Sequence, residues 1–261
     1  MTDQSGTIEE IVKDVTTGAR FEAYATQPER NVAQAYEIQD GVVAALMSSG
    51  ARGEIAGWKI AANSQQLLER FKLDEPASGR VFADQRHDSP ATLNVADYTE
   101  FAFEPEIAAI MKSTLAPSDA PLQPDEVLAA VERFVPAMEL LDMRLTNMPS
   151  THIPDAIAQN ISNVGAVLGG PGITPEELDT ANIRTTLTIG GKVEHDVTGA
   201  APQSPLDAVA WLASHLAARC LTLEAGQIVL CGTHSPIWFH RGTGEIEVEM
   251  SGLGKVSVTL I

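Results

Sequence analysis

The chain has 261 residues, and its 35 aspartates and glutamates outnumber its 17 lysines and arginines to give a formal net charge of -18. A field this negative repels phosphate backbones and anionic lipid, which argues against nucleic acid and membranes as partners. No run approaches the roughly 18 apolar residues of a spanning helix, the first residues lack the pattern of a signal peptide, and the two cysteines show no metal or redox spacing. We therefore expect a cytoplasmic protein.

Two helices are predicted ahead of the main body. Apolar residues recur at helical spacing across residues 31–49, and Gly50 is placed to end that helix. A weaker helical pattern covers residues 7–20. We expect these helices to form an N-terminal helical region, residues 1–52, in front of a β-rich catalytic domain formed by residues 53–261.

The catalytic domain is predicted to begin with a strand. Residues 54–62 alternate between apolar and polar side chains, and Ser64 is placed to cap a short helix that runs to Phe71. Residues 74–90 contain prolines, a glycine and mixed charges with little periodicity. We expect this stretch to be a long functional loop.

Strands dominate the rest of the chain. They are predicted over residues 101–111, 134–145, 164–168, 227–231, 245–250 and 255–261, with a hairpin around Gly190 and Gly191, and helices are predicted over residues 124–133, 154–159 and from Ser204 onward. Short strands with a few helices laid against them predict an α+β fold with a mixed, β-rich body.

Two carboxylates stand two residues apart in the apolar run Phe103-Glu104-Pro105-Glu106-Ile107. Alternate side chains of a strand share one face, so Glu104 and Glu106 are expected to point together, roughly 7 Å apart along the backbone. Unpaired, such buried acids raise one another's pKa, and a divalent cation removes that cost. Glu139, in a second apolar run, can complete a three-carboxylate nest of the kind that holds Mg²⁺ or Mn²⁺. The sequence therefore predicts a metal-dependent enzyme.

Lys59 is the second candidate, because it stands in Gly57-Trp58-Lys59-Ile60 at the end of a predicted buried strand. Lysines are seldom buried without a partner. This one either extends to solvent, pairs with a carboxylate, or serves as a proton carrier or anion anchor. The residues alone favour extension to solvent.

Seven short motifs follow one another along the chain in a recognisable order. They are Ala35-Tyr36-Glu37-Ile38-Gln39, Gly57-Trp58-Lys59-Ile60 with Ser64, Gly79-Arg80-Val81-Phe82, Phe103-Glu104-Pro105-Glu106-Ile107, Glu139-Leu140-Leu141-Asp142-Met143-Arg144, Asp155-Ala156-Ile157-Ala158-Gln159-Asn160, and Ala208-Val209-Ala210-Trp211-Leu212. Together they resemble the hydratase and decarboxylase branch of the fumarylacetoacetate hydrolase superfamily, typified by 2-keto-4-pentenoate hydratase. The resemblance runs from about residue 31 to the C-terminus.

The resemblance implies a fold and a set of site residues. The fold would be a mixed β-sheet or β-roll body with flanking helices and an N-terminal helical region. The metal ligands would be Glu104, Glu106 and Glu139, binding Mg²⁺ or Mn²⁺. The lysine of the family corresponds to Lys59, its acidic loop residue to Asp84 and its serine to Ser162, and these three would be catalytic.

Three departures from the family pattern fall where pocket walls are expected. Ala61-Ala62-Asn63 stands where the family often has Gly-Leu-Thr, Ala158-Gln159-Asn160 replaces Ala-Asp-Asn, and Cys231-Gly232 replaces Pro-Gly. We expect Ala61 and Gln159, together with Lys59, to contact the substrate. The departures leave the metal site intact and put the identity of the substrate in doubt.

The implied activity is hydration of a 2-hydroxy-2,4-dienoate to a 4-hydroxy-2-oxo acid, as in meta-cleavage degradation of aromatic compounds. The close rival is decarboxylation of a 4-oxalocrotonate-type 2-oxo acid, which would use the same metal. An acylpyruvate-type hydrolase would call for an aspartate ligand and a histidine base that have no obvious counterpart here.

A catalytically silent structural subunit of a complex is the alternative from another class. Retention of Lys59 with all three glutamates argues against it. Family members assemble into homo-oligomers, so we expect one here, and a complex with a pathway enzyme stays open.

Overall fold

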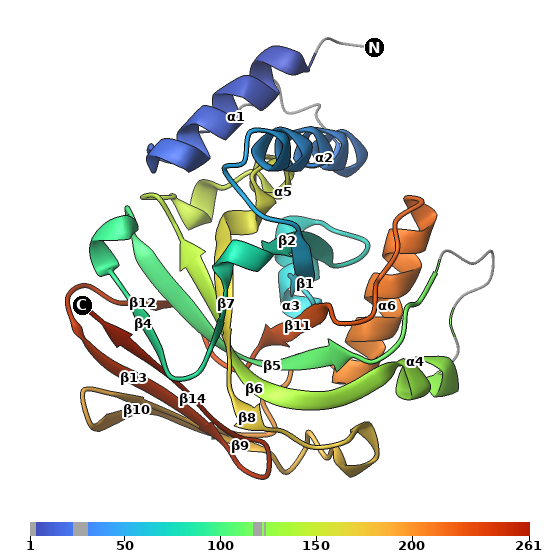
Figure 1. Cartoon of the computed structure of the whole chain (residues 1–261), viewed down its shortest axis with the longest axis vertical. Helices are drawn as coiled ribbons and strands as arrows, with labels where there is room; N and C mark the ends of the chain where they lie inside the picture. Colours follow the sequence, from blue (N-terminus) through green and yellow to red (C-terminus); the bar gives the residue numbers. More distant parts are fainter. Residues whose placement is uncertain (1–3, 23–30, 117–121, 123) are drawn as a thin grey trace.

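The computed structural model describes residues 4–22, 31–116, 122 and 124–261. Its largest unit is a mixed eight-stranded sheet (Figure 1). In spatial order the strands are β2 (Ala77–Phe82), β1 (Ile55–Ala61), β11 (Ile228–Thr233), β5 (Phe101–Met111), β6 (Val131–Asp142), β7 (Asn163–Leu168) and β3 (Arg86–Asp88), with β12 (Trp238–Phe239) paired to β5. The α+β fold class predicted from the sequence is confirmed.

A second, six-stranded sheet packs against the first. It contains β10 (Lys192–Thr198), β9 (Arg184–Ile189), β13 (Gly244–Met250), β14 (Gly254–Leu260) and β4 (Ala91–Leu93), with β8 (Gly170–Pro171) paired to β14. The hairpin expected at Gly190 and Gly191 joins β9 to β10, and both glycines have positive φ, as a tight hairpin turn requires. This sheet lies at the opposite end of the molecule from helices α1 and α2 (Figure 1).

The helices flank the sheets. They are α1 (Ser5–Thr17), α2 (Val32–Ser48), α3 (Gln65–Phe71), α4 (Pro124–Ala130), α5 (Ile153–Ala158) and α6 (Pro205–Ala218). Asn31 and Gln34 form a reciprocal capping box at the start of α2, and the Ser64 hydroxyl accepts a hydrogen bond from the Leu67 amide at the start of α3. These side chains satisfy amides that would otherwise lack partners, so both helices begin where the sequence predicts.

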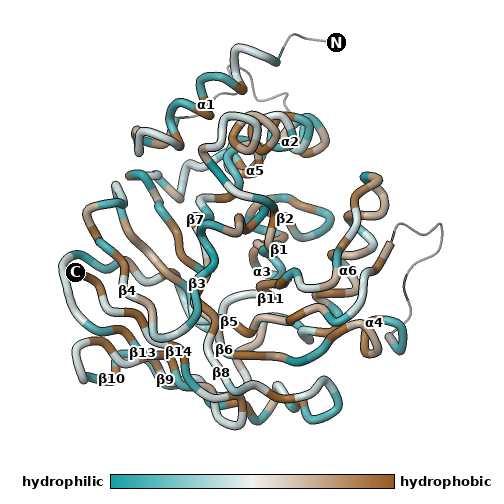
Figure 2. Tube along the Cα trace, in the orientation of Figure 1, coloured by the Kyte–Doolittle hydropathy of each residue, from teal (hydrophilic) through white to brown (hydrophobic). Residues whose placement is uncertain are grey.

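Each central strand divides its side chains between two faces. On β5, Phe103 and Ile107 enter the main core, which they share with Leu187 of β9 and Val248 of β13. The opposite face of the same sheet carries a separate apolar cluster that includes Ala108 and Leu230. Figure 2 shows strong hydrophobic colouring along β5 and β6, as expected for strands covered on both sides.

The prediction of a long loop over residues 74–90 is wrong, because β2 and β3 lie within this range. All six residues of β2 are buried, yet Ser78, Gly79 and Arg80 give it no apolar period. Arg80 is accommodated because its guanidinium donates to the side chains of Gln39 and Asp40 on α2. Tertiary contacts therefore stabilise a strand that local periodicity does not reveal.

The N-terminal helices contact the β body directly. Ile38 and Val42 of α2 pack with Phe82 of β2 and Ala158 of α5. The buried Gln39 amide donates to the carbonyls of residues in β2 and α5. The division into residues 1–52 and 53–261 stays a prediction. Within the described residues, no helix combines the length and apolarity that crossing a bilayer requires.

His234 follows β11 and gives a prediction for acid stability. Its amide donates to the Pro105 carbonyl, its Nδ1 lies 2.9 Å from the Thr185 hydroxyl oxygen, and burial lowers its pKa to about 4. The unfolded chain takes up this proton near pH 6.5 and the folded chain only near pH 4, so falling pH favours unfolding across that window. We expect this group to cost roughly 3 kcal/mol of stability by pH 4.

Urea unfolding of the parent protein and of His234→Gln at pH 7 and pH 5 measures this contribution. The variant should lose less stability on acidification than the parent does. Equal losses in the two proteins would show that His234 is not the group responsible.

Candidate metal centre and its cleft

The three predicted glutamates meet on the face of the main sheet opposite the main core. Glu104 of β5 and Glu139 of β6 are direct cross-strand partners, and Glu106 lies two residues along β5 on the same face. One carboxylate oxygen from each lies within 4.8 Å of the others. Glu104 is 9% exposed, Glu106 1% and Glu139 0%. Like charges directly opposite one another destabilise a sheet, so this cluster needs a counterion.

An irregularity in β11 completes the surroundings of Glu106. The pairing register of β11 with β5 shifts between Leu230 and Thr233, and there the Gly232 amide donates to Glu106 Oε2 at 2.8 Å. Gly232 has φ +113°, and a Cβ at this position would lie 2.5 Å from the Asn63 amide nitrogen. Only glycine fits this close approach. Where the family has Pro-Gly, this chain has Cys231-Gly232, so the glycine that this backbone conformation requires is retained.

Lys59 is buried beside the carboxylates rather than extended to solvent. Its Nζ lies 3.1 Å from Glu139 Oε1, and its side chain is 3% exposed. Burial by itself lowers the pKa of Lys59, but the attraction of Glu139, Glu104 and Glu106 outweighs it and raises the pKa. The lysine is therefore held as an ammonium ion at the edge of the cluster.

One ammonium does not neutralise three carboxylates. Burial raises the pKa of Glu104 to about 8, with repulsion from Glu139 adding to it, while Lys59 and the Thr233 side chain oppose the rise. Burial, followed by repulsion from Glu139 and Glu104, raises the pKa of Glu106 well above its ordinary value. Glu139 Oε2 is buried with no hydrogen-bond partner. Three oxygen donors with surplus negative charge and an unused lone pair fit a hard divalent cation.

Asn163, at the start of β7, is a site residue that the sequence pattern does not reveal. Its amide nitrogen donates to Glu139 Oε1 at 2.9 Å, and its amide oxygen accepts from the Gly165 amide at 3.1 Å. Asn163 therefore fixes the orientation of a carboxylate from a strand next to it in the sheet. No local pattern marks an asparagine for this role, because its partner lies 24 residues earlier.

We expect Asn163→Ala to weaken divalent-cation binding about tenfold, because losing a partner that orients a ligand typically costs 10- to 100-fold in affinity. Calorimetric titration of the purified protein with Mn²⁺ measures this directly. Asn182→Ala, a change at an exposed asparagine after the η5 turn (Pro175–Glu177), is the matched control. Equal affinity in both variants would show that Asn163 does not orient Glu139.

The cluster opens into a cleft of about 650 Å³. Strands β1, β11 and β6 run in the same direction, because β11 is parallel to β1 and both β11 and β6 are antiparallel to β5. Their carboxyl ends therefore share one edge of the sheet, and the cleft lies there. Its lining includes Lys59, Ala61, Asn63, Arg70, Glu104, Glu106, Leu141, Met143, Met148, Ser162, Thr233, Ile237 and Phe239.

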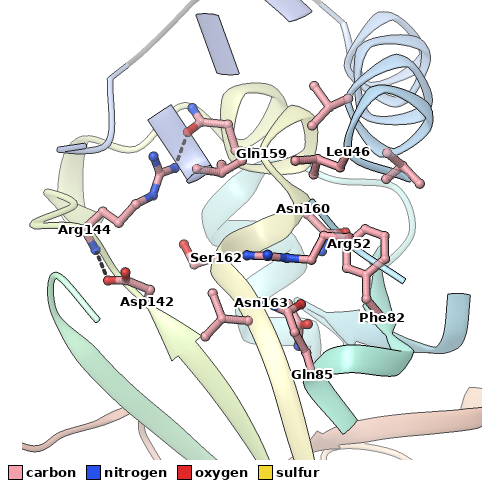
Figure 3. Close-up of a pocket in the computed structure, with 14 residues that line it drawn as sticks. Leu46, Arg52, Phe82, Gln85, Asp142, Arg144, Gln159, Asn160, Ser162 and Asn163 are labelled. Atoms are coloured by element: carbon pink, nitrogen blue, oxygen red, sulfur yellow. Dashed lines mark hydrogen bonds between the residues drawn. The ribbon is translucent and has the colours of Figure 1, made fainter. Parts of the chain in front are cut away.

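A smaller cavity of about 50 Å³ lies between the N-terminal helices and the start of β7 (Figure 3). Ser162 lines both this cavity and the cleft. Gln159 lines only the small cavity. Its side-chain oxygen accepts from Arg144, its amide nitrogen donates to the Glu22 carbonyl, and it is 3% exposed. Both ends of the amide are thus engaged by protein, and the contact of Gln159 with substrate stays a prediction.

Asp84 is also placed away from the cleft. It lies in the short helical turn η1 (Ala83–Gln85), and its Oδ1 accepts a hydrogen bond from the Gly53 amide at 2.7 Å. Its side chain is 42% exposed, and its second oxygen lies 4.0 Å from Arg52. The carboxylate therefore ties the turn after β2 to the residues before β1, and the catalytic role of Asp84 stays a prediction.

The fold and the site together define a class of protein. A mixed β body carries a buried carboxylate cluster with a paired lysine at the floor of a cleft. The family model described as fumarylacetoacetate (FAA) hydrolase C-terminal matches residues 63–261. The chain belongs to the fumarylacetoacetate hydrolase superfamily, in its hydratase and decarboxylase branch.

Individual relatives agree with this placement. The chain is 29% identical to 2-oxo-hept-4-ene-1,7-dioate hydratase of Escherichia coli, over 90% of this chain and 88% of the relative. It is 30% identical to 2-keto-4-pentenoate hydratase of Paraburkholderia xenovorans, over 88% and 84%. Among solved structures, 4-oxalocrotonate decarboxylase from Pseudomonas putida G7, complexed with magnesium and adipate, matches with a TM-score of 0.89 at 24% identity, covering 98% of this chain and 96% of that one. This last likeness confirms the fold.

Proposed function

We propose that the protein is a metal-dependent hydratase that adds water to a 2-hydroxy-2,4-dienoate and gives a 4-hydroxy-2-oxo acid. The observation that carries the proposal is the buried cluster of Glu104, Glu106 and Glu139, with Lys59 3.1 Å from Glu139, at the floor of an open cleft. The similarity to hydratases over most of the chain supports the same reaction class.

In this proposal the three glutamates hold Mg²⁺ or Mn²⁺, which are cations that a small set of carboxylate oxygens suits. Once bound, such a cation acts as a Lewis acid on a 2-oxo acid. The magnesium named for the similar decarboxylase structure supports this choice of metal.

Lys59 supplies a positive charge and a proton beside the cluster. Its ammonium group attracts the substrate carboxylate into a chain that is otherwise strongly acidic. Ala61 follows it on the same face of β1 and leaves space above the ammonium group. Ser162 lines the cleft and offers a hydroxyl to the substrate or to water.

The reaction balances without an oxidant or a reductant. The enol proton of the dienoate is lost and a proton is added at carbon 5, which gives a conjugated 2-oxo acid. The oxygen of water then bonds to carbon 4, and carbon 3 gains a proton as the ketone reforms. Lys59 carries the protons in this scheme.

Decarboxylation of a 4-oxalocrotonate-type 2-oxo acid is the second candidate. The chain is 30% identical to a 4-oxalocrotonate decarboxylase of a Pseudomonas species, over 87% of this chain and 86% of the relative. Both reactions need negative charge to be stabilised at the 2-oxo group, so the same cluster and the same lysine serve either one.

One assay separates the candidates. A 2-hydroxy-2,4-dienoate and a 2-hydroxymuconate are each mixed with the protein and Mg²⁺ or Mn²⁺, while ultraviolet absorbance and released CO₂ are followed together. Loss of absorbance without CO₂ means hydration, and loss with CO₂ means decarboxylation. No change with either compound at any metal concentration would remove both proposals and favour a catalytically silent subunit. Addition of EDTA should abolish any turnover.

The homo-oligomer expected from the family resemblance is also proposed here. Light scattering of the purified chain gives its mass in solution. A mass near the 27.8 kDa of one chain would rule the oligomer out.

A further inference from the structure

The sheet face that carries the glutamates changes from charged to apolar at one end. Alternate residues of β6 share this face, so Glu139 is followed by Leu141 and then by Met143 just beyond the strand. On β5, which runs the opposite way, Ala102 follows Glu104 in the same direction. On these two strands the polar side chains of this face therefore stop at the carboxylates, and Ala102 and Leu141 continue the face as hydrocarbon toward the end of β6.

These residues form a small cluster that is separate from the main core. Ala102, Leu141 and Met143 are buried, and Met148 and Ile237 pack against them. Four of the five line the cleft, and we call Leu141, Met143, Met148 and Ile237 the apolar wall. Phe239 also lines the cleft and is 48% exposed, which is a large apolar side chain open to solvent. Exposed apolar surface inside a cleft indicates a site for an apolar ligand group.

Among the described residues that line the cleft, the cations are Lys59 and Arg70, and neither belongs to the elements that carry the apolar wall. Arg144 follows Met143, but its guanidinium is turned toward Gln159 and the Ala19 carbonyl and lies 5.7 Å from the centre of the Phe21 ring (Figure 3). Arg70 belongs to α3, which follows β1, and β11 and β5 separate β1 from β6 in the sheet. A carboxylate placed at the apolar wall would lose its hydration without gaining an ion pair.

We propose that the apolar wall is a subsite for the far end of the substrate, and that the protein selects 2-oxo acids with an extended hydrocarbon tail over those that end in a second carboxylate. This inference rests on the proposed function, because the 2-oxo acid end is the part that binds at the glutamates. Methionine is suited to such a wall, because its flexible side chain adapts to tails of different shapes.

Three saturated 2-oxo acids test the subsite by binding, without the need for turnover. They are 2-oxopentanoate, 2-oxooctanoate and 2-oxooctanedioate, titrated calorimetrically into the Mg²⁺-loaded protein. The second differs from the first only in three methylenes and from the third only in its far end. Burial of each methylene should tighten binding about fourfold, so 2-oxooctanoate should bind tens of times more tightly than 2-oxopentanoate. It should also bind at least tenfold more tightly than 2-oxooctanedioate.

Two lysine substitutions sharpen the test. Met148 is half-buried in the turn η3 (Met148–Ser150), so Met148→Lys adds a cation at the wall without disturbing a strand. We expect it to reverse the preference between 2-oxooctanoate and 2-oxooctanedioate. Phe239→Lys serves the same purpose if the first variant does not fold. Val193→Lys, at a 54% exposed position of β10 outside the cleft, should keep the preference of the parent protein.

The outcomes separate this inference from the proposed function. Equal affinity for the two chain lengths, or tighter binding of the dicarboxylate, would overturn the apolar subsite. If 2-oxooctanedioate binds more tightly than 2-oxooctanoate and Arg70→Gln abolishes this difference in affinity, Arg70 is the group that binds the second carboxylate. Turnover of short dienoates without any preference for a tail would support the proposed hydratase function and contradict the apolar subsite. Binding that depends on the tail, without any turnover, would support the apolar subsite and contradict the hydratase function.

Discussion

Replacing Glu106 with glutamine should reduce turnover on the order of 10³-fold, because a cation that stabilises several kcal/mol of transition-state charge would no longer be held. The change keeps the shape of the side chain and an acceptor for the Gly232 amide, and removes an ionisable carboxyl group from a buried position. The metal-free variant should therefore be more stable than the metal-free parent at neutral pH, because glutamine does not carry the free-energy cost that burial and repulsion from Glu139 and Glu104 impose on the Glu106 carboxyl group.

Calorimetry with Mn²⁺ and thermal unfolding with and without metal measure both effects. Metal should raise the melting temperature of the parent protein strongly and that of Glu106→Gln little. The matched control is Glu245→Gln, which removes an exposed carboxylate from β13 and should behave like the parent. Full turnover of Glu106→Gln with metal still bound would contradict the ligand assignment.

Replacing Lys59 with methionine should affect stability and turnover but not metal affinity. The buried ammonium is the cation nearest to Glu139, and removal of one partner from a buried ion pair typically costs 3–5 kcal/mol. We expect a loss of this size in the free energy of unfolding of the metal-free protein. Loss of a positioned proton carrier should lower turnover by about 10²-fold or more. Metal binding should be retained, because the substitution removes a competing positive charge from the carboxylates.

The split between turnover and metal affinity is what distinguishes a catalytic lysine from a structural one. Denaturant unfolding without metal, calorimetry with Mn²⁺ and steady-state kinetics with a dienoate provide the three readouts. Lys255→Met is the matched control, because this exposed lysine pairs only with carboxylates at the surface of β13 and should change stability by less than about 1 kcal/mol. Unchanged kinetics in metal-loaded Lys59→Met would show that Lys59 acts only as a counterion to the carboxylates and has no catalytic role.

The sequence predicts most elements and the composition of the metal centre for a simple reason. A strand repeats every two residues, so Glu104 and Glu106 share a face whatever the rest of the fold does. Helix α2 begins at its asparagine cap and α3 at Ser64 because those hydrogen bonds are local. Features whose partners lie within a few residues are visible in the order of the residues themselves.

The features that the sequence does not reveal depend on distant partners. β2 is read as a loop because its buried Arg80 is stabilised by residues about 40 positions earlier in the chain. Asp84 corresponds to the acidic loop residue of the family, but its carboxylate accepts a hydrogen bond from the Gly53 amide. Gln159 resembles a substrate contact, but Arg144 and the Glu22 carbonyl engage both ends of its amide.

By itself the sequence determines the negative charge of the chain, the α+β class, the family and the residue types at the centre. Only the tertiary structure decides that Glu139 stands directly opposite Glu104, that Lys59 pairs with Glu139, and that Leu141 and Met143 continue the same face into the cleft. The physical reason is strand register. A shift of one residue would turn every one of these side chains to the other face, and register is set by hydrogen bonds between segments that are far apart in the chain.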